Sequence, residues 1–256
     1  MSGFSADWLA LRAGADDRAR NPGLLDRLTT WADGRPLLIT DLGGGTGATR
    51  RALAPRLPAA RWRILDHDAA LLAAISPRPD LEIVLIDLAA APGGVFEPAP
   101  DLITASAFFD LVSLDWIRRL AARLAAARAP LYAALTYDGQ EDWRPEPPHE
   151  ARALGAFHRD MRADKGFGPA LGPAAHGALA AALRGFGYAV HEGESDWRLA
   201  RPEDQALIEA LAAGGAAAGE VRAALAPAAL RDWRAAREAA NTVRIGHRDL
   251  LAFPPG

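Results

Sequence analysis

The sequence contains no cysteine, which excludes disulfides, thiolate metal sites, iron–sulfur clusters and a cysteine nucleophile. Lysine is nearly absent too, because Lys165 is the only lysine among 29 basic residues. A lone lysine stands out where arginine is the default. No apolar run reaches the roughly 18 residues that a membrane span needs, and the first residues lack the basic and apolar regions of a signal peptide. We therefore expect a cytoplasmic protein with no membrane partner.

What is present fits an ordinary globular protein. The chain has 256 residues, a hydrophobic fraction of 50% and a net charge of -3. This length is enough for one large domain with a sizeable core. The charge balance disfavours a nucleic-acid partner. The sequence leaves the oligomeric state open.

Strands and helices alternate over the first half of the chain. Residues 5–33 favour two helices that form an N-terminal cap. Buried strands are then expected at 36–42, 61–66, 81–87, 101–105 and 130–138, with helices at 46–54, 68–75 and 116–127. Such alternation predicts βαβ units and a doubly wound parallel sheet.

The second half departs from this alternation. The expected elements are a proline-rich loop at 141–149, a helix at 150–162, a glycine-rich segment at 165–173, a helix at 176–184, a strand at 187–195, an interrupted helical stretch at 203–240 and a final strand at 242–253.

A glycine loop follows the first strand, with the sequence Asp-Leu-Gly-Gly-Gly-Thr-Gly at 41–47. Glycines there allow a tight turn and a close approach of a ligand to the backbone. The spacing fits two ligands. Gly43-x-Gly45-x-x-Ala48 matches the dinucleotide fingerprint, and Asp41-x-Gly43-x-Gly45-x-Gly47 matches the pattern of S-adenosylmethionine (SAM) methyltransferases.

Two features favour SAM over a dinucleotide. The carboxylate of Asp41 would repel a pyrophosphate and attract the α-ammonium of a methionine moiety. The Tyr-x-x-x-Lys pair of short-chain dehydrogenases is missing, since Met161 lies four residues before Lys165. Asp66, at the end of the second strand, suits either ligand because a carboxylate there can take both ribose hydroxyls.

With these residues, the chain resembles the class I (Rossmann-like) SAM-dependent methyltransferases over residues 5–253. The resemblance implies an α/β fold with a doubly wound, seven-stranded, mostly parallel sheet of order 3-2-1-4-5-7-6, whose last strand is antiparallel. It also implies one domain over 1–256, made of a helical cap (1–34), a cofactor-binding half (36–139) and an acceptor-side half (140–256) that carries a helical insertion (203–240) before the last strand.

The resemblance also assigns cofactor contacts to residues that match the family's motifs. Asp66 would bind the ribose, with His67 near the adenosine. Asp87 would take the adenine amino group, helped by the backbone of Leu88, and Ser106 would line the methionine side. The predicted cofactor-binding residues are Asp41, Gly43, Gly45, Gly47, Asp66, His67, Asp87, Leu88, Ser106 and Arg12, the last facing the methionine carboxylate from the cap.

The methyl acceptor is less clearly indicated. Ser106-Ala107-Phe108-Phe109 replaces the Asn/Asp-Pro-Pro-Tyr motif of amino-methylating enzymes of DNA or release factors. No metal-ligand spacing of His, Asp and Glu occurs, so we expect no metal. Acceptor groups are expected after the fifth strand, outside the carboxyl ends of the strands. There Asp138 or His158 would act as base, and Tyr137, Arg162 and Lys165 would bind the acceptor. Trp8 would bind the acceptor from the N-terminal helix.

His158, Arg162 and Lys165 are four and three residues apart, so they share a helix face if the helix reaches Lys165. Bare backbone N–H groups in Gly166-Phe167-Gly168 would help to hold an anion. The function predicted first is therefore methyl transfer from SAM to oxygen or nitrogen of a small, polar or anionic molecule. The alternatives are a protein or RNA methyltransferase, a NAD-type oxidoreductase and a non-catalytic SAM-binding protein.

Overall fold

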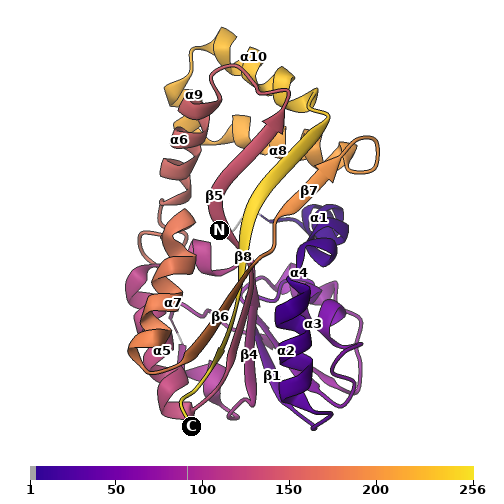
Figure 1. Ribbon diagram of the computed structural model, residues 1–256, viewed down its shortest axis with the longest axis vertical. Coiled ribbons are helices and arrows are strands. Elements are labelled where there is room, and N and C mark those ends of the chain that lie inside the picture. Colours follow the sequence, from indigo (N-terminus) through magenta and orange to yellow (C-terminus); the bar gives the residue numbers. More distant parts are fainter. Residues whose placement is uncertain (1–3, 91) are drawn as a thin grey trace.

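The computed structural model describes residues 4–90 and 92–256 (Figure 1). Its centre is a mixed sheet of order β3-β2-β1-β4-β5-β8-β6, and β7 pairs with β8. The strands are β1 (Leu38–Leu42), β2 (Arg61–Asp66), β3 (Leu81–Leu85), β4 (Leu102–Ser106), β5 (Leu131–Arg144), β6 (Ala189–Glu194), β7 (Trp197–Ala200) and β8 (Thr242–Phe253). The pairs among β1 to β5 are parallel, and β8 runs antiparallel to its neighbours. The expected strand order is confirmed.

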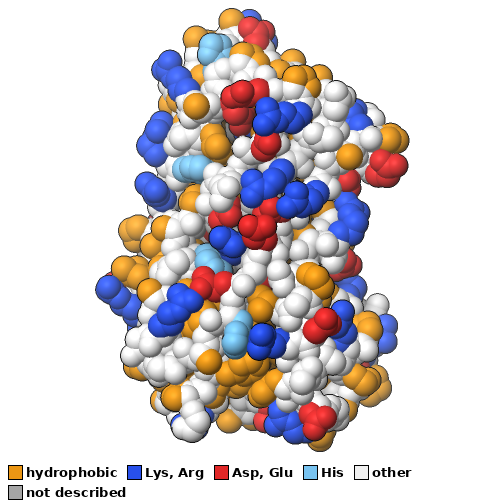
Figure 2. All heavy atoms as spheres, in the orientation of Figure 1, with side chains coloured by type: hydrophobic (Ala, Val, Ile, Leu, Met, Phe, Trp, Pro, Cys, Tyr) orange, Lys and Arg blue, Asp and Glu red, His pale blue; other side chains and the backbone are white. Residues whose placement is uncertain are grey.

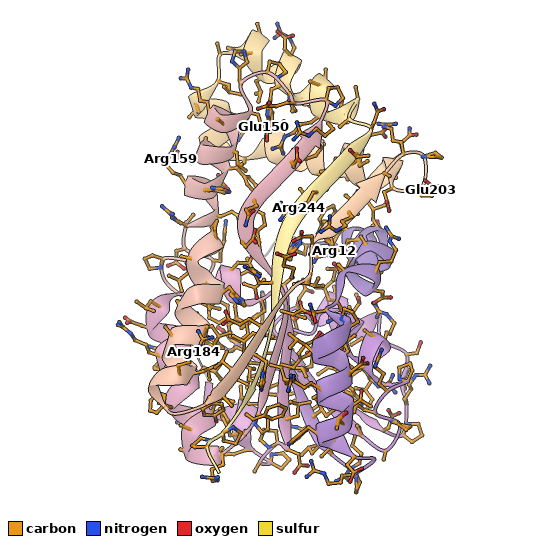
Figure 3. All side chains as sticks on the ribbon, viewed as in Figure 1. Arg12, Glu150, Arg159, Arg184, Glu203 and Arg244 are labelled. Atoms are coloured by element: carbon orange, nitrogen blue, oxygen red, sulfur yellow. The ribbon has the colours of Figure 1, made fainter. Side chains whose placement is uncertain are left out.

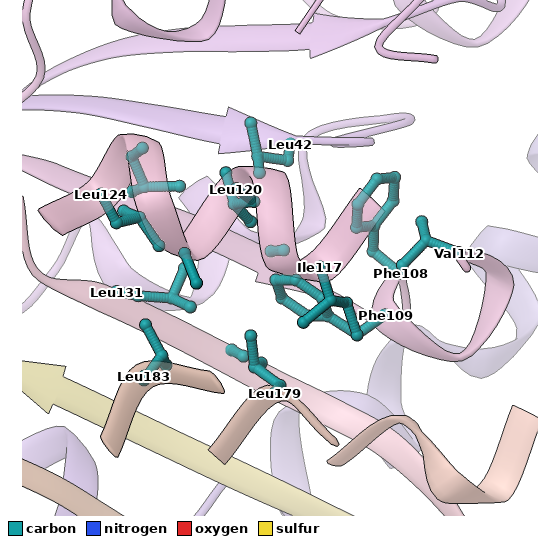
Figure 4. Packing of buried hydrophobic residues seen from close by; sticks show 14 of the residues in the cluster. Leu42, Phe108, Phe109, Val112, Ile117, Leu120, Leu124, Leu131, Leu179 and Leu183 are labelled. Carbon is teal, nitrogen blue, oxygen red and sulfur yellow. The ribbon is translucent and has the colours of Figure 1, made fainter. Parts of the chain in front are cut away.

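Helices cover both faces of this sheet (Figure 1). The helices are α1 (Ala6–Ala19), α2 (Pro22–Ala32), α3 (Ala48–Leu53), α4 (Ala69–Ala73), α5 (Leu114–Ala127), α6 (Glu150–Met161), α7 (Ala175–Gly185), α8 (Gln205–Ala217), α9 (Gly219–Ala224) and α10 (Pro227–Glu238), with 3-10 turns η1 (Pro92–Phe96), η2 (Phe109–Leu111) and η3 (Gly172–Ala174). One core cluster joins α2 and α3 to the sheet, and the larger one joins α5 and α7 to its other face (Figure 4).

Polar caps explain where several helices begin. The side chains of Ser5, Asn21 and Ser113 accept hydrogen bonds from backbone N–H groups three residues later, at 3.1, 3.1 and 3.3 Å. Asp68 caps α4 in the same way. Each cap satisfies a donor that the helix itself leaves unpaired. The caps therefore set the starts of α1, α2, α4 and α5 from local sequence.

Two parts of the sheet differ from expectation. The expected loop at 141–149 is wrong in its first four residues, because 141–144 continue β5 and pair with residues 242–245 of β8. The second difference is β7, a four-residue strand that was not expected. Each segment has only four residues and lies within two residues of a proline, so its own sequence does not indicate a strand, and both form strands by pairing with β8.

The helical insertion covers the extended ends of β5 and β8, at the top of Figure 1. It consists of α8, α9 and α10, and α9 packs against α6. Its breaks lie at Ala218 and between Ala224 and Pro227, which confirms the expected interruption. Within the described part of the chain, no helix is both long and apolar enough to cross a membrane.

Candidate functional site

A cavity of about 240 Å³ lies at the carboxyl ends of β1, β2 and β4. Parallel strands bring these ends to one edge of the sheet, where doubly wound folds place their ligands. The glycine loop forms one wall, and Leu9 and Arg12 of α1 form another. Lys165 and Phe167 contribute from the loop after α6. The cavity thus lies between the sheet, the N-terminal helix and the acceptor-side half.

The glycine loop adopts the left-handed backbone that its sequence suggested. The φ angles of Gly43, Gly45 and Gly47 are 57°, 52° and 79°. A Cβ atom on Gly43 would lie 2.6 Å from Cδ2 of Phe108, a distance that a side chain cannot tolerate. Gly43, Gly44 and Gly45 line the cavity, whereas Gly47 precedes α3 outside its wall.

Asp66 ties the loop to β2. Its Oδ2 accepts a hydrogen bond from the Gly45 N–H at 2.8 Å, and its Oδ1 accepts one from the Asp68 N–H at 3.0 Å. Asp66 is buried but still lines the cavity, together with His67, whose Nδ1 lies 3.4 Å from Asp66 Oδ1. A carboxylate offers about four acceptor positions, so Asp66 keeps acceptor capacity towards the cavity.

Asp41 lies beneath the loop and does not form part of the cavity wall. Its Oδ1 accepts a hydrogen bond from Thr104 Oγ1 at 2.7 Å. Its Oδ2 is buried and has no hydrogen-bond partner among the described residues. Burial raises the pKa of Asp41 to about 7, because a low dielectric disfavours the charged carboxylate. The expected contact with an ammonium group stays a prediction.

Arg20 is a buried residue near this site that sequence reasoning missed. Its Nη1 donates to Ser106 Oγ at 3.0 Å, and Ser106 also accepts from Thr49 Oγ1 at 3.1 Å. Ser106 and Thr49 line the cavity. Arg20 Nε and Nη2 are buried and lack partners among the described residues. In a chain so rich in arginine, nothing in the sequence marked this one.

Of the two residues predicted to hold the adenine, only Leu88 lies in the cavity wall. Leu88 lines the cavity, and its carbonyl accepts a hydrogen bond from Trp116 Nε1 at 3.0 Å. Asp87 is exposed and does not form part of the wall. Its Oδ1 accepts a hydrogen bond from the Ala89 N–H at 2.8 Å and so closes a local turn. The contact of Asp87 with adenine remains a prediction.

The N-terminal helix brings one charged pair to the cavity. Arg12 donates to both oxygens of Asp16, at 2.9 Å from Nε and 3.0 Å from Nη2, and both residues line the wall. The guanidinium also lies 4.8 Å from the ring centre of Trp197, and Figure 3 labels Arg12 beside β7. Trp8 packs instead against the cluster that contains Tyr137.

The predicted acceptor residues do not share one wall. Tyr137 OH donates to Glu141 Oε1 and lies within hydrogen-bond distance of His158 Nε2, both at 3.0 Å. Burial lowers the pKa of His158. Asp138 accepts a hydrogen bond from the Gln140 N–H at 3.0 Å. These residues lie outside the cavity wall, as does the exposed Arg162.

Two expectations for the loop after α6 are wrong. The helix ends at Met161, so Lys165 does not share a helix face with His158. The N–H groups of Gly166 and Gly168 are not bare, since they donate to Asp164 Oδ1 at 2.7 and 3.0 Å. The loop instead bends on Asp164 and brings Lys165 into the cavity wall. Lys165 itself therefore remains a candidate for acceptor binding.

No metal centre emerges from the part of the chain that the structure describes. Within residues 4–90 and 92–256, no group of three or more His, Cys, Asp or Glu side chains is arranged to hold a metal ion.

Comparisons with known proteins agree with the fold. No family profile matches the chain. It is 35% identical over 144 residues to trans-aconitate 2-methyltransferase of Paracidovorax citrulli, a match that covers 54% of this chain and 49% of that protein. The match thus spans about half of the relative's length.

Two solved structures of other proteins align with nearly the whole chain. A putative type II methyltransferase from Anaeromyxobacter dehalogenans superposes with a TM-score of 0.52 at 16% identity, over 93% of this chain and 97% of that one. A cyclopropane-fatty-acyl-phospholipid synthase-like protein from Lactobacillus casei gives a TM-score of 0.49 at 15% identity, over 98% and 95%.

Three observations agree on one fold. The sheet has the order β3-β2-β1-β4-β5-β8-β6 with an antiparallel β8. The glycine loop and Asp66 meet at the cavity. The structure from Anaeromyxobacter dehalogenans superposes over 93% of the chain with a TM-score of 0.52. The chain has the class I, Rossmann-like fold of the SAM-dependent methyltransferases.

Proposed function

We propose that this protein transfers a methyl group from SAM to an oxygen or nitrogen atom of a small molecule. The observation that carries the proposal is the cavity at the strand ends, bounded by the glycine loop that Asp66 holds. SAM, when bound, supplies the methyl group on its sulfonium. The protein's part is to orient the two molecules and exclude water, because the donor is already activated.

The buried charges beside the cavity fit the methionine end of SAM. That end carries one ammonium and one carboxylate. Behind Ser106 and Thr49, one oxygen of Asp41 and two nitrogens of Arg20 lack partners among the described residues. Buried polar atoms without hydrogen-bond partners are costly, so a zwitterion at this wall would supply partners to both residues. We therefore place the methionine end near Ser106 and the ribose near Asp66.

The acceptor side supports a small molecule with a polar or anionic group. Lys165 lies in the cavity wall, and within the described segments its ammonium forms no ion pair with a carboxylate. The name of the partial relative, trans-aconitate 2-methyltransferase, refers to a small organic acid. On the face drawn in Figure 2, acidic and basic side chains are interspersed, without the broad basic surface that an RNA acceptor would favour.

Ligand-dependent thermal stability tests the proposal directly. A ligand that binds only the folded state stabilises it in proportion to its concentration over its dissociation constant. We expect SAM and S-adenosylhomocysteine to raise the Tm, and NAD to leave it unchanged. Stabilisation by NAD alone would favour an oxidoreductase. A screen with methyl-labelled SAM then identifies the acceptor, and binding without transfer to any acceptor would favour a non-catalytic SAM-binding protein.

Once an acceptor is known, the kcat and KM of Lys165→Ala and His158→Ala test the roles predicted for these two residues. Lys165→Ala removes a cation from the wall, so we expect KM for an anionic acceptor to rise about tenfold with little change in kcat. His158→Ala removes a residue outside the wall and tests the role of base predicted for it. Steady-state kinetics on both variants measure this. Unchanged kcat and KM in both would remove these residues from the acceptor site.

A further inference from the structure

Arg12 is a cation of the cavity wall whose neighbours hold it in one orientation. Its side chain is 9% exposed, and its Nε and Nη2 donate to Asp16 at 2.9 and 3.0 Å. The guanidinium lies 4.8 Å from the ring centre of Trp197, whose Nε1 donates to Asp16 Oδ1 at 3.0 Å. A guanidinium that is already fixed loses little entropy when a ligand binds to it. Arg12 is therefore preorganised to hold an anion.

One edge of this guanidinium is unused. Arginine carries five N–H groups, and Asp16 engages only the edge formed by Nε and Nη2. Nη1 has no hydrogen-bond partner among the described residues, and unlike the unpaired nitrogens of Arg20 it is not closed off from solvent. Because Arg12 lines the cavity, a ligand there can reach the edge formed by Nη1 and Nη2. Such an edge matches the two oxygens of a carboxylate.

Two carboxylates could use this edge, that of SAM and one on the acceptor. The methionine end of SAM, placed near Ser106, has a different arginine beside it, since Arg20 Nη1 donates to Ser106 Oγ at 3.0 Å. Arg12 instead lies against Trp197 of β7, whose ring centre is 4.9 Å from that of His247 of β8. Both strands belong to the acceptor-side half of the chain. These contacts favour the acceptor.

The charges of the wall match a single negative charge on the acceptor. Apart from Asp66 and His67 at the ribose end, the charged side chains that the described residues contribute to the wall are Arg12, Asp16 and Lys165. Two cations and one anion leave one positive charge. Arg12 is buried, whereas Lys165 is exposed at the mouth of the cavity. One carboxylate on the acceptor would neutralise this wall, and a second would be in excess.

The part of the wall next to Lys165 is otherwise apolar. Phe167 lies two residues further along the same loop, and its ring centre is 5.7 Å from that of Phe108, edge to face. Phe108 and Leu111 of η2 line the wall as well, and Figure 4 labels Phe108 in the core cluster. Small-molecule pockets combine such apolar surfaces with a few polar groups that fix orientation. An acceptor that fits this wall has an apolar body beside its anionic group.

We propose that Arg12 binds a carboxylate of the methyl acceptor, not that of SAM, and that the acceptor is a small monocarboxylic acid with an apolar body. This inference rests on the proposed methyltransferase function. The carboxylate accepts hydrogen bonds from the free edge of Arg12, and Lys165 supplies the net positive charge of the wall. Asp16 and Trp197 are positioning residues, because they fix the plane of the guanidinium.

Two nucleosides show whether Arg12 serves the cofactor. S-adenosylhomocysteine keeps the amino-acid end of SAM, and 5′-methylthioadenosine lacks it. Calorimetry measures both affinities in the wild type, in Arg12→Lys and in the double variant Arg12→Gln with Asp16→Asn. Lysine keeps a cation beside Asp16, and the double variant removes both charges, so neither leaves a buried carboxylate without a partner. The control is Arg18→Lys on the same helix, where the arginine side chain is 57% exposed.

We expect the ratio of the two nucleoside affinities to stay within threefold of the wild type in every variant. A larger fall of S-adenosylhomocysteine alone, confined to the Arg12 variants, would place Arg12 at the methionine carboxylate and overturn the proposal. Loss of both nucleosides in both Arg12 variants would show a purely structural role and would overturn it as well.

Matched probes test the acceptor class on the complex with S-adenosylhomocysteine. The aliphatic set is hexanoate, hexanamide and adipate; the aromatic set is 3-phenylpropanoate, 3-phenylpropanamide and 3-(4-carboxyphenyl)propanoate. Each set compares one carboxylate with its neutral amide and with a diacid, and NMR titration measures the dissociation constants. In at least one set we expect the wild type and Arg18→Lys to bind the monocarboxylate at least tenfold more tightly than either partner.

The preference for the monocarboxylate over its amide should fall below threefold in both Arg12 variants, because neither offers the free guanidinium edge. The proposal is overturned if the monocarboxylates bind no better than their amides, if the diacids bind as well as the monocarboxylates, if no probe binds, or if the preference over the amide survives in the Arg12 variants. Failure of the wild type to bind S-adenosylhomocysteine or SAM would instead overturn the proposed function.

Discussion

Replacing Arg237 by methionine is expected to lower the free energy of unfolding by about 3–5 kcal/mol. Arg237 is the central cation of the insertion, and both it and Glu141 are 5% exposed. Its guanidinium lies 4.2 Å from the ring centre of Trp143 and 4.4 Å from that of Trp233. It donates to Glu141 at 2.7 Å and also to Glu150, which Figure 3 labels in the upper part of the molecule.

The loss is large because methionine leaves two carboxylates buried without their cation. Breaking one side of a buried ion pair costs more than the pair itself contributes to stability. Urea unfolding at pH 7 measures the change, provided that the slope with denaturant is unaltered. The matched control is Arg234→Ala on the same helix, whose side chain is 51% exposed and which should cost less than about 0.5 kcal/mol. Equal losses in both variants would contradict the central role of Arg237.

Asp41→Asn is expected to stabilise the ligand-free protein at high pH and to weaken SAM binding. Asparagine keeps the acceptor for Thr104 Oγ1 and removes a buried negative charge. The pKa of Asp41 is raised to about 7 in the folded protein, whereas an unfolded aspartate titrates near 3.9. The folded state thus binds more protons than the unfolded state between about pH 4 and pH 7.

The sign of the pH effect follows from that difference. Stability contributed by protonated Asp41 is present at low pH and is lost as the pH rises through about 7. Asp41→Asn should therefore gain about 4 kcal/mol of unfolding free energy at pH 8 and almost none at pH 4. Urea unfolding at both values tests this, with Asp26→Asn as an exposed control. A gain that does not depend on pH would show that the charge is not the cause.

The affinity for SAM should move in the opposite direction. If the ammonium of SAM is held by the field of Asp41, calorimetry at pH 8 should show binding at least tenfold weaker in Asp41→Asn. The same variant would then be more stable without ligand and bind its cofactor less well, a combination that a general folding defect cannot produce. Unchanged affinity would limit Asp41 to shaping the loop beneath Gly44.

Local sequence determined much of this protein. The Asp-x-Gly-x-Gly-x-Gly loop, the alternation of strands and helices, and the caps at Ser5 and Asp68 depend on residues close in sequence, so they could be predicted with the sheet order that the family resemblance implied. Gly43, Gly45, Asp66, Ser106 and Lys165 were also predicted for the site and lie in one cavity wall.

Only the tertiary structure decided what depends on distant partners. Residues 141–144 and β7 become strands because β8 pairs with them. Arg20 stands out only because folding buries its guanidinium and leaves two of its nitrogens without partners among the described residues, which no local pattern records. The separation of His158 from Lys165 depends on where α6 ends and on Asp164 closing the next turn. Local patterns set the elements, whereas burial and long-range pairing set which charges the cavity can use.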